Sequence, residues 1–152
     1  MSTPEEKLAT MGLTVPEVAR PVASYVPAVR SGGHVFTSGQ LPMRDGQLLA
    51  TGKVGGAVTP ELALECARQC ALNALAAVRA EVGELSAVRR IVKVVAFVAS
   101  TPDFTGQPGV ANGASQQLGD VFGDLGQHAR SAVGVPVLPL DAPVEVELIV
   151  EI

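Results

Sequence analysis

The fold is decided by residues 59–99, which read TPELALECARQCALNALAAVRAEVGELSAVRRIVKVVAFVA. Thr59-Pro60-Glu61 is a strong helix start, because it joins an N-cap residue, a proline at the first helical position and an acid in the first turn. The predicted helix runs to about Val82 and stops at Gly83. Residues 90–99 then predict a strand that is apolar on both faces, so we expect both of its faces to be covered.

The predicted helix is amphipathic, which indicates that one side packs on a sheet. Its polar stripe is Glu61, Glu65, Arg68, Gln69 and Arg79, and its apolar face is Ala63, Ala67, Cys70, Ala74 and Val78. Cys66 and Cys70 lie four residues apart, so one face holds both. We expect two small buried core residues there rather than a disulfide.

Upstream of this unit, residues 3–11 predict a short helix with Thr3 or Ser2 as its N-cap. Prolines interrupt residues 13–27, which predicts an extended arm. Two strands follow at 28–30 and 34–40, joined by a Ser31-Gly32-Gly33 turn, and residues 41–58 predict loops with turns at Asp45-Gly46 and Gly55-Gly56. Residues 1–24 are therefore expected to be an N-terminal helix and arm, and residues 25–152 the main domain.

Downstream, the pattern predicts a helix at about 110–122 and two strands at 129–135 and 144–152. The order β-β-α-β-α-β-β indicates an α+β fold with two helices on one sheet face. In the last strand, alternate residues Val144 to Ile152 face one way, while Glu145, Glu147, Ile149 and Glu151 face the other. Ile149 among these acids suggests a partly covered, interfacial surface.

Composition limits the class of protein. The 152 residues fit one domain, with 47% hydrophobic and only 17% charged residues. Such sparse charge favours an oligomer, although a chain merely rich in alanine and glycine would look the same. The net charge of −4 and 3% aromatic content argue against nucleic acid as a partner. No apolar run reaches the roughly 20 residues of a membrane span and the start lacks an apolar leader, so we expect a cytoplasmic protein with no membrane partner.

Arg130 is the most informative candidate, because it is the only Lys or Arg in the 59 residues after Lys93. A lone guanidinium in apolar, acid-rich surroundings could bind a substrate carboxylate through two parallel hydrogen bonds, and the alternative is an ion pair with Glu145 or Glu147. Tyr25 could orient a ligand or simply pack, and Glu145 could move protons or simply be solvated.

Two further features complete the candidate chemistry. Gly39 could offer a backbone N–H to a ligand oxygen. His34 and His128 lack metal-ligand spacing, and no phosphate-binding or dinucleotide motif is present. We therefore expect no metal and no cofactor.

Together these segments resemble the reactive intermediate deaminase (RidA/YjgF) family, over about residues 22–152. The motifs that carry the resemblance are Ser24-Tyr-Val-Pro27, His34-Val-Phe-Thr-Ser-Gly-Gln-Leu-Pro42, Ala129-Arg-Ser-Ala-Val-Gly-Val135, and Leu138-Pro139 followed by Val144-Glu-Val-Glu147. The arm and the segment 103–115 resemble a longer RidA-like subgroup, also called endoribonuclease L-PSP.

The resemblance implies a chorismate-mutase-like subunit, a homotrimer whose three sheets form a central barrel, and active sites in the clefts between subunits. It also implies cofactor-independent hydrolysis of enamine or imine intermediates, such as 2-aminoacrylate, to 2-keto acids and ammonia. A non-catalytic trimer that binds small carboxylates or a partner protein is the alternative. An RNA-cleaving role, attributed to some relatives, fits the acidic charge poorly.

By the same resemblance, Arg130 binds the substrate carboxylate and Glu145 lies near the attacking water. Tyr25 lines the cleft, Gly39 supplies a backbone contact and Asn112 faces the same cleft. The chain departs from the family at Ala132, where many members have a cysteine. That difference removes any thiol chemistry from this position.

Overall fold

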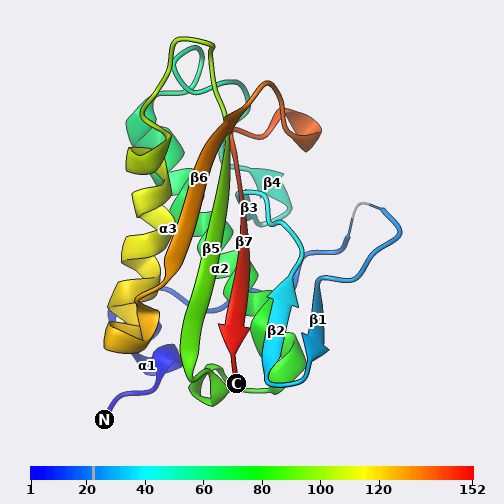
Figure 1. Ribbon diagram of the computed structural model, residues 1–152, viewed down its shortest axis with the longest axis vertical. Helices are drawn as coiled ribbons and strands as arrows, with labels where there is room; N and C mark the ends of the chain where they lie inside the picture. Colours follow the sequence, from blue (N-terminus) through cyan, green and yellow to red (C-terminus); the bar gives the residue numbers. More distant parts are fainter. Residues whose placement is uncertain (22) are drawn as a thin grey trace.

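The computed structural model describes residues 1–21 and 23–152 and shows two helices packed on one face of a five-stranded sheet (Figure 1). Val22, which lies in the predicted arm and begins the range of the family resemblance, lies outside the described residues. The strands are β1 (Ala28–Ser31), β2 (His34–Thr37), β5 (Arg90–Ala99), β6 (Ala129–Val135) and β7 (Val144–Glu151), in the spatial order β1-β2-β7-β5-β6. All pairs are antiparallel except β5 with β6, which is parallel. The predicted α+β class is therefore confirmed.

The helices follow their capping signals. α2 spans Pro60–Val82, with the Thr59 hydroxyl accepting the Leu62 N–H at 3.2 Å and Gly83 at its C-terminal end. α1 (Pro4–Thr10) begins with a capping box between Thr3 and Glu6, in which each side chain accepts the other residue's backbone N–H. Both helices confirm the predictions.

α3 (Gln107–Phe122) begins three residues earlier than the predicted residue 110. Pro108 occupies its first turn, where a missing N–H costs nothing, and the Gln107 side chain donates to the carbonyl of Phe104 at 2.8 Å. These contacts extend the helix into a segment whose apolar pattern is too weak to reveal it.

The predicted loop at 41–58 contains a small hairpin, β3 (Met43–Arg44) and β4 (Gln47–Leu48), around the predicted Asp45-Gly46 turn. This hairpin covers part of α2, so Gln69, which the sequence placed on the exposed stripe, is only 6% exposed. Its side chain accepts from Arg44 Nε at 3.1 Å and donates to Asn73 at 3.0 Å, which satisfies the buried amide. The short 3₁₀ turns η1 (Leu85–Ala87), η2 (Gly123–Gly126) and η3 (Pro139–Asp141) join the remaining elements.

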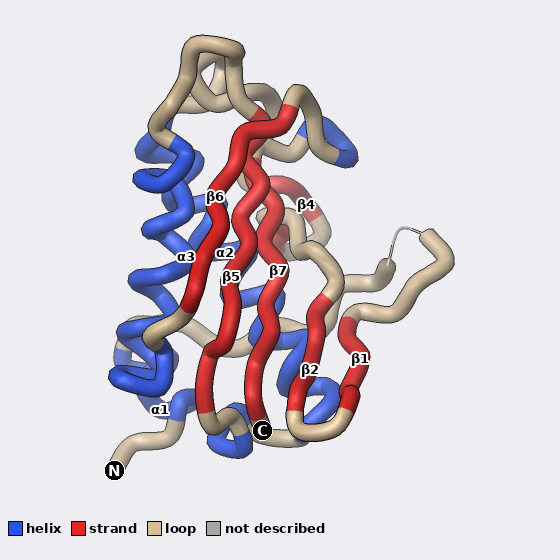
Figure 2. The backbone as a smooth tube through the Cα atoms, in the orientation of Figure 1, coloured by secondary structure: helices blue, strands red, loops and turns tan. Residues whose placement is uncertain are grey.

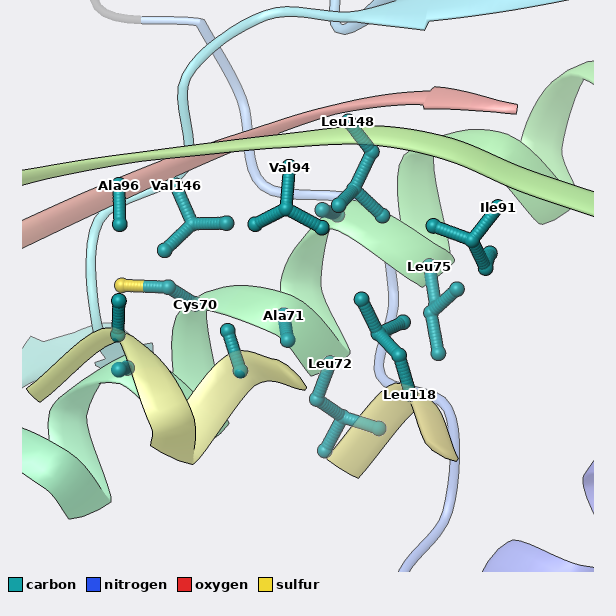
Figure 3. Close-up of a cluster of buried hydrophobic side chains, with 14 of the residues drawn as sticks. Cys70, Ala71, Leu72, Leu75, Ile91, Val94, Ala96, Leu118, Val146 and Leu148 are labelled. Carbon is teal, nitrogen blue, oxygen red and sulfur yellow. The ribbon is translucent and has the colours of Figure 1, made fainter. Parts of the chain in front are cut away.

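The core lies between the sheet and α2 and α3 (Figure 3). Ile91, Val94, Val146 and Leu148 point from the sheet toward the helices and are fully buried or nearly so. Cys66 and Cys70 are free and fully buried, as predicted. Burial raises the pKa of Cys66 to about 11, helped by the nearby Glu65 carboxylate, so the thiol stays protonated at neutral pH.

Among the described residues, no α-helix covers the opposite face of the sheet (Figure 2). Val29, Phe36 and Val133 are 44–54% exposed on it. β5 is therefore buried on its helix side but only partly covered on this open face, so the prediction that both of its faces are covered is not met within one subunit. Among the described residues, no helix is both long and apolar enough to cross a membrane. A cytoplasmic location stays a prediction.

Candidate functional site

Arg130 lies near the start of β6 and reaches α3. Its Nη1 donates to Asn112 Oδ1 at 2.7 Å and to Ser115 Oγ at 3.2 Å, and its Nη2 donates to the Pro108 carbonyl at 3.3 Å. In the register, Arg130 lies opposite Val94, a core residue that faces the helices. The parallel β5–β6 pairing therefore directs the guanidinium toward α3.

The contacts of Arg130 leave one particular edge of the guanidinium open. A guanidinium has five N–H donors, and the three protein acceptors use both hydrogens of Nη1 and one of Nη2. In the described part of the chain, nothing accepts from Nε or from the second Nη2 hydrogen. Nε–H and an Nη2 hydrogen together can bind the two oxygens of a carboxylate.

The structure contradicts the ion-pair alternative for Arg130. Glu145 and Glu147 are on β7, which is separated from β6 by β5, and they lie opposite Phe97 and Val95 on the open face. Among the described residues, the ion pair that forms within 4.0 Å joins Arg68 and Glu65 at 3.7 Å. Arg130 therefore carries a positive charge that no acidic side chain of the described chain neutralises.

Glu145 and Gly39 form a second group on the open face. A side chain at Gly39 would overlap the Glu145 carboxylate, because a Cβ there would lie 2.7 Å from Glu145 Cδ. The neighbouring Gln40 holds this segment beside β7, since it exchanges two backbone hydrogen bonds with Val146 at 2.8 and 3.0 Å. Glycine at position 39 thus allows a close approach to the carboxylate.

The Glu145 carboxyl is a good candidate for proton transfer. Partial burial raises its pKa above the usual range, and the Glu147 carboxylate raises it further. A carboxyl with a raised pKa holds a proton more readily near neutral pH, as a general acid or base requires.

Tyr25 is 45% exposed and lines a cavity of about 730 Å³ together with Gly39 and Gln40. The cavity lies between the N-terminal arm, the β3–β4 hairpin and α2, and Arg44, Gln69 and Asn73 supply its polar wall. Arg130, Asn112 and Glu145 do not line it. The structure therefore places Tyr25 near Gly39 but separates both from Arg130.

The predicted site residues thus form two groups within one subunit. Arg130 and Glu145 are offset by two strand spacings and three residues along the strands, and they point from opposite sheet faces. At roughly 4.8 Å per strand and 3.3 Å per residue, their Cα atoms lie about 14 Å apart. A small carboxylate bound to Arg130 cannot reach Glu145 of the same subunit.

Sequence reasoning gave no role to Ser115 or His128. The Ser115 hydroxyl lies 2.8 Å from His128 Nε2 and also accepts from Arg130, and His128 Nδ1 lies 2.6 Å from the Gly126 carbonyl oxygen. Ser115 follows Asn112 by one helical turn, a spacing that places both side chains on one helix face. The spacing was the one sequence signal that could have linked Ser115 to Asn112. It does not reveal that this helix face meets β6.

Known proteins are similar to this chain over nearly its full length. The family described as "YjgF/chorismate_mutase-like, putative endoribonuclease" matches residues 5–152. Protein TCP17 of Trypanosoma cruzi is 44% identical over 95% of this chain and 91% of its own length. A 2-iminobutanoate/2-iminopropanoate deaminase of Dermatophagoides farinae is 32% identical over 92% of this chain and 94% of its own. A crystal structure of Agrobacterium tumefaciens protein Atu1372, of unknown function, is 45% identical, covering 98% and 92% of the two chains with a TM-score of 0.92.

Proposed function

Because this chain belongs to the YjgF/chorismate-mutase-like family, we propose that it hydrolyses enamine and imine intermediates of the 2-aminoacrylate type to 2-keto acids and ammonia. The observation that carries the proposal is that Arg130 has free N–H donors on Nε and Nη2. Among the described residues, no acidic side chain neutralises its charge. The relative named as a deaminase supports the same reaction class.

In the proposed reaction, Arg130 binds the substrate carboxylate and Glu145 serves as the proton carrier. The enamine takes up a proton on its terminal carbon and becomes the imine. Water adds to the imine carbon while Glu145 accepts one of its protons and returns it to nitrogen, which gives a carbinolamine. The C–N bond then breaks as the carbinolamine hydroxyl passes its proton through Glu145 to the departing nitrogen, so that the keto acid and ammonia leave. One imine and one water thus give one keto acid and one ammonia. The imine carbon is already electrophilic, so positioning and one proton carrier are sufficient catalytic groups.

We also propose that two subunits complete each site, within a homotrimer. The separation of Arg130 from Glu145 supports this, because Arg130 of one subunit could meet Glu145 of another. The exposed apolar residues of the open face, Val29, Phe36 and Val133, also suit a subunit interface.

The activity test measures keto acid released from 2-aminoacrylate and 2-iminobutyrate, generated in place by a serine/threonine dehydratase, with semicarbazide competing for the imine. Wild type should speed pyruvate and 2-ketobutyrate release. In Arg130→Ala, the rate above the uncatalysed reaction should be at least tenfold lower. Arg130→Lys keeps the charge but not the planar pair of donors, so it should also be impaired. The exposed Arg89→Ala is the matched control and should behave as wild type.

If folded wild-type protein gives no acceleration, the deaminase proposal is wrong. Titration with 2-oxobutanoate, the same compound as 2-ketobutyrate, would then show whether the protein only binds small carboxylates.

The shared site has its own test, which combines two inactive variants. Arg130→Ala and Glu145→Gln are each expected to be inactive, and their mixture is refolded together. If each site takes its arginine and its glutamate from different subunits, about a quarter of the sites in a 1:1 mixture regain both groups. No recovery from mixed trimers, with the size checked by light scattering, would place the whole site within one subunit.

A further inference from the structure

The half-buried His128 lies in a series of hydrogen bonds that also includes Ser115 and Gly126, and the donor and acceptor of each bond can be assigned. Its Nδ1 is 2.6 Å from the Gly126 carbonyl oxygen, which can only accept a hydrogen bond. Nδ1 must therefore carry a hydrogen. In the neutral imidazole Nε2 is then bare and accepts, so the Ser115 hydroxyl, 2.8 Å away, is the donor.

This direction determines what Ser115 offers to Arg130. The hydroxyl hydrogen is engaged by His128, so the oxygen lone pairs remain for the Nη1 hydrogen of Arg130 at 3.2 Å. Hydrogen bonds therefore run from Arg130 to Ser115, from Ser115 to His128, and from His128 to Gly126. Each group has one possible role in this chain, and consecutive bonds of this kind polarise one another.

The end of the hydrogen-bond series at Gly126 is held in place by packing. A Cβ at Gly126 would lie 2.6 Å from the carbonyl oxygen of Leu118, so the turn η2 packs tightly against the end of α3. Because Ser115 is also on α3, the positions of Gly126 and Ser115 are set by one rigid unit. The imidazole spans the two and fixes the serine hydroxyl relative to β6.

We propose that His128 is a positioning residue, which acts through Ser115 to hold Nη1 of Arg130 on α3 and to keep the Nε/Nη2 edge open for a carboxylate. The identity of that carboxylate, an imino or keto acid, rests on the proposed function. Without an acceptor at position 128, the Ser115 hydroxyl can turn to a carbonyl of the preceding helical turn, as serines in helices do. Its oxygen would then no longer face Arg130, and the guanidinium would lose one of its three anchors.

The first test observes the histidine directly. Long-range ¹H–¹⁵N correlation of the imidazole nitrogens distinguishes the two neutral tautomers at a pH where the ring is uncharged. His128 is expected as the Nδ1–H form, with the exposed His34 as an internal reference. An Nε2–H tautomer for His128 would reverse the chain and overturn the proposal.

The second test uses variants matched in size. His128→Gln retains an acceptor that can reach Ser115, whereas His128→Leu does not, and Ser115→Ala removes the middle link. His128→Leu and Ser115→Ala should each weaken 2-oxobutanoate binding and raise KM about fivefold, with kcat changed less than twofold. His128→Gln should stay within twofold of wild type. The double variant should be no worse than either single variant, because all three break the same chain.

The Arg130 Nε–H resonance gives a readout that does not require activity. It should broaden in His128→Leu and Ser115→Ala and stay unchanged in the control His34→Gln. If the tautomer and this resonance behave as expected while no imine is hydrolysed, the proposed function fails and the positioning role stands. If His128→Leu leaves both the resonance and 2-oxobutanoate binding unchanged, the positioning role is refuted whatever the activity.

Discussion

Gly113 in the middle of α3 provides a sharp test of how the Arg130 site is built. A Cβ at this position would overlap the carbonyl oxygen of Leu64 on α2 and would lie 3.2 Å from the Ala67 methyl group. Gly113 also lies between Asn112 and Ser115, the two side chains that hold Arg130. Gly113→Ala must therefore separate α3 from α2 by roughly 1 Å to restore van der Waals contact.

Two opposing effects set the magnitude. Alanine is a better helix residue than glycine by about 1 kcal/mol. Overpacking at a close helix contact costs about 1–3 kcal/mol, and backbone atoms cannot turn away as a flexible side chain can. Because the nearest neighbouring atoms at Gly113 are backbone, the cost falls in the upper part of that range, about 2–3 kcal/mol. The net expectation for Gly113→Ala is then a loss of about 1–2 kcal/mol in unfolding free energy, equivalent to a drop of roughly 2–8 °C in Tm.

Gly119 in the same helix is the matched control, because a Cβ there would meet no atom within 4 Å. Gly119→Ala should gain about 0.5–1 kcal/mol, so the same substitution in one helix is expected to have opposite signs. Thermal unfolding at one protein concentration measures both variants. 2-Oxobutanoate binding should weaken in Gly113→Ala alone, because Asn112 and Ser115 move. Equal stabilisation by both substitutions would refute the close α2–α3 contact.

Three further outcomes are expected. Burial raises the pKa of Glu145, so the folded state binds this proton more tightly than the unfolded state does, and the associated stability is lost as pH rises through the folded pKa. Glu145→Gln should therefore have a higher Tm than wild type at pH 8. A gain in Tm that does not shrink toward pH 4 would contradict this. Cys66 and Cys70 are fully buried, and their raised pKa values keep both thiols protonated, so Ellman's reagent at pH 8 should label neither until the protein is unfolded. Thr59→Ala removes the N-cap of α2 and should cost about 1 kcal/mol in urea unfolding, whereas Thr59→Ser should cost much less.

The elements that the sequence predicted well have their signals in neighbouring residues. α2 begins at Pro60 and ends before Gly83 because its capping residues act within one turn of the chain. β6 has its predicted bounds, and β7 ends one residue earlier than expected. The core face of α2 follows from its period, since every third or fourth residue meets the same surface.

The errors share a different cause, which is contact between segments distant in sequence. Gln69 is buried because a hairpin some 25 residues upstream covers it, and α3 starts early because the Gln107 side chain bonds to Phe104 and Ser100. Arg130 could be singled out by its isolation, but its protein partner could not, because spacing offered an ion pair with Glu145 or Glu147 whereas the structure pairs it with Asn112.

The sequence by itself determined the α+β class, the bounds of α2, β5 and β6, and which side chains are candidates for chemistry, because capping and periodicity act locally. Tertiary structure alone decided which of those side chains lie together. The parallel pairing of β6 with β5 turns Arg130 toward α3, while the antiparallel pairing of β7 places Glu145 on the opposite face. Successive residues of a strand alternate between faces, so which sheet face a residue occupies depends on register, and register is set by the partner strand.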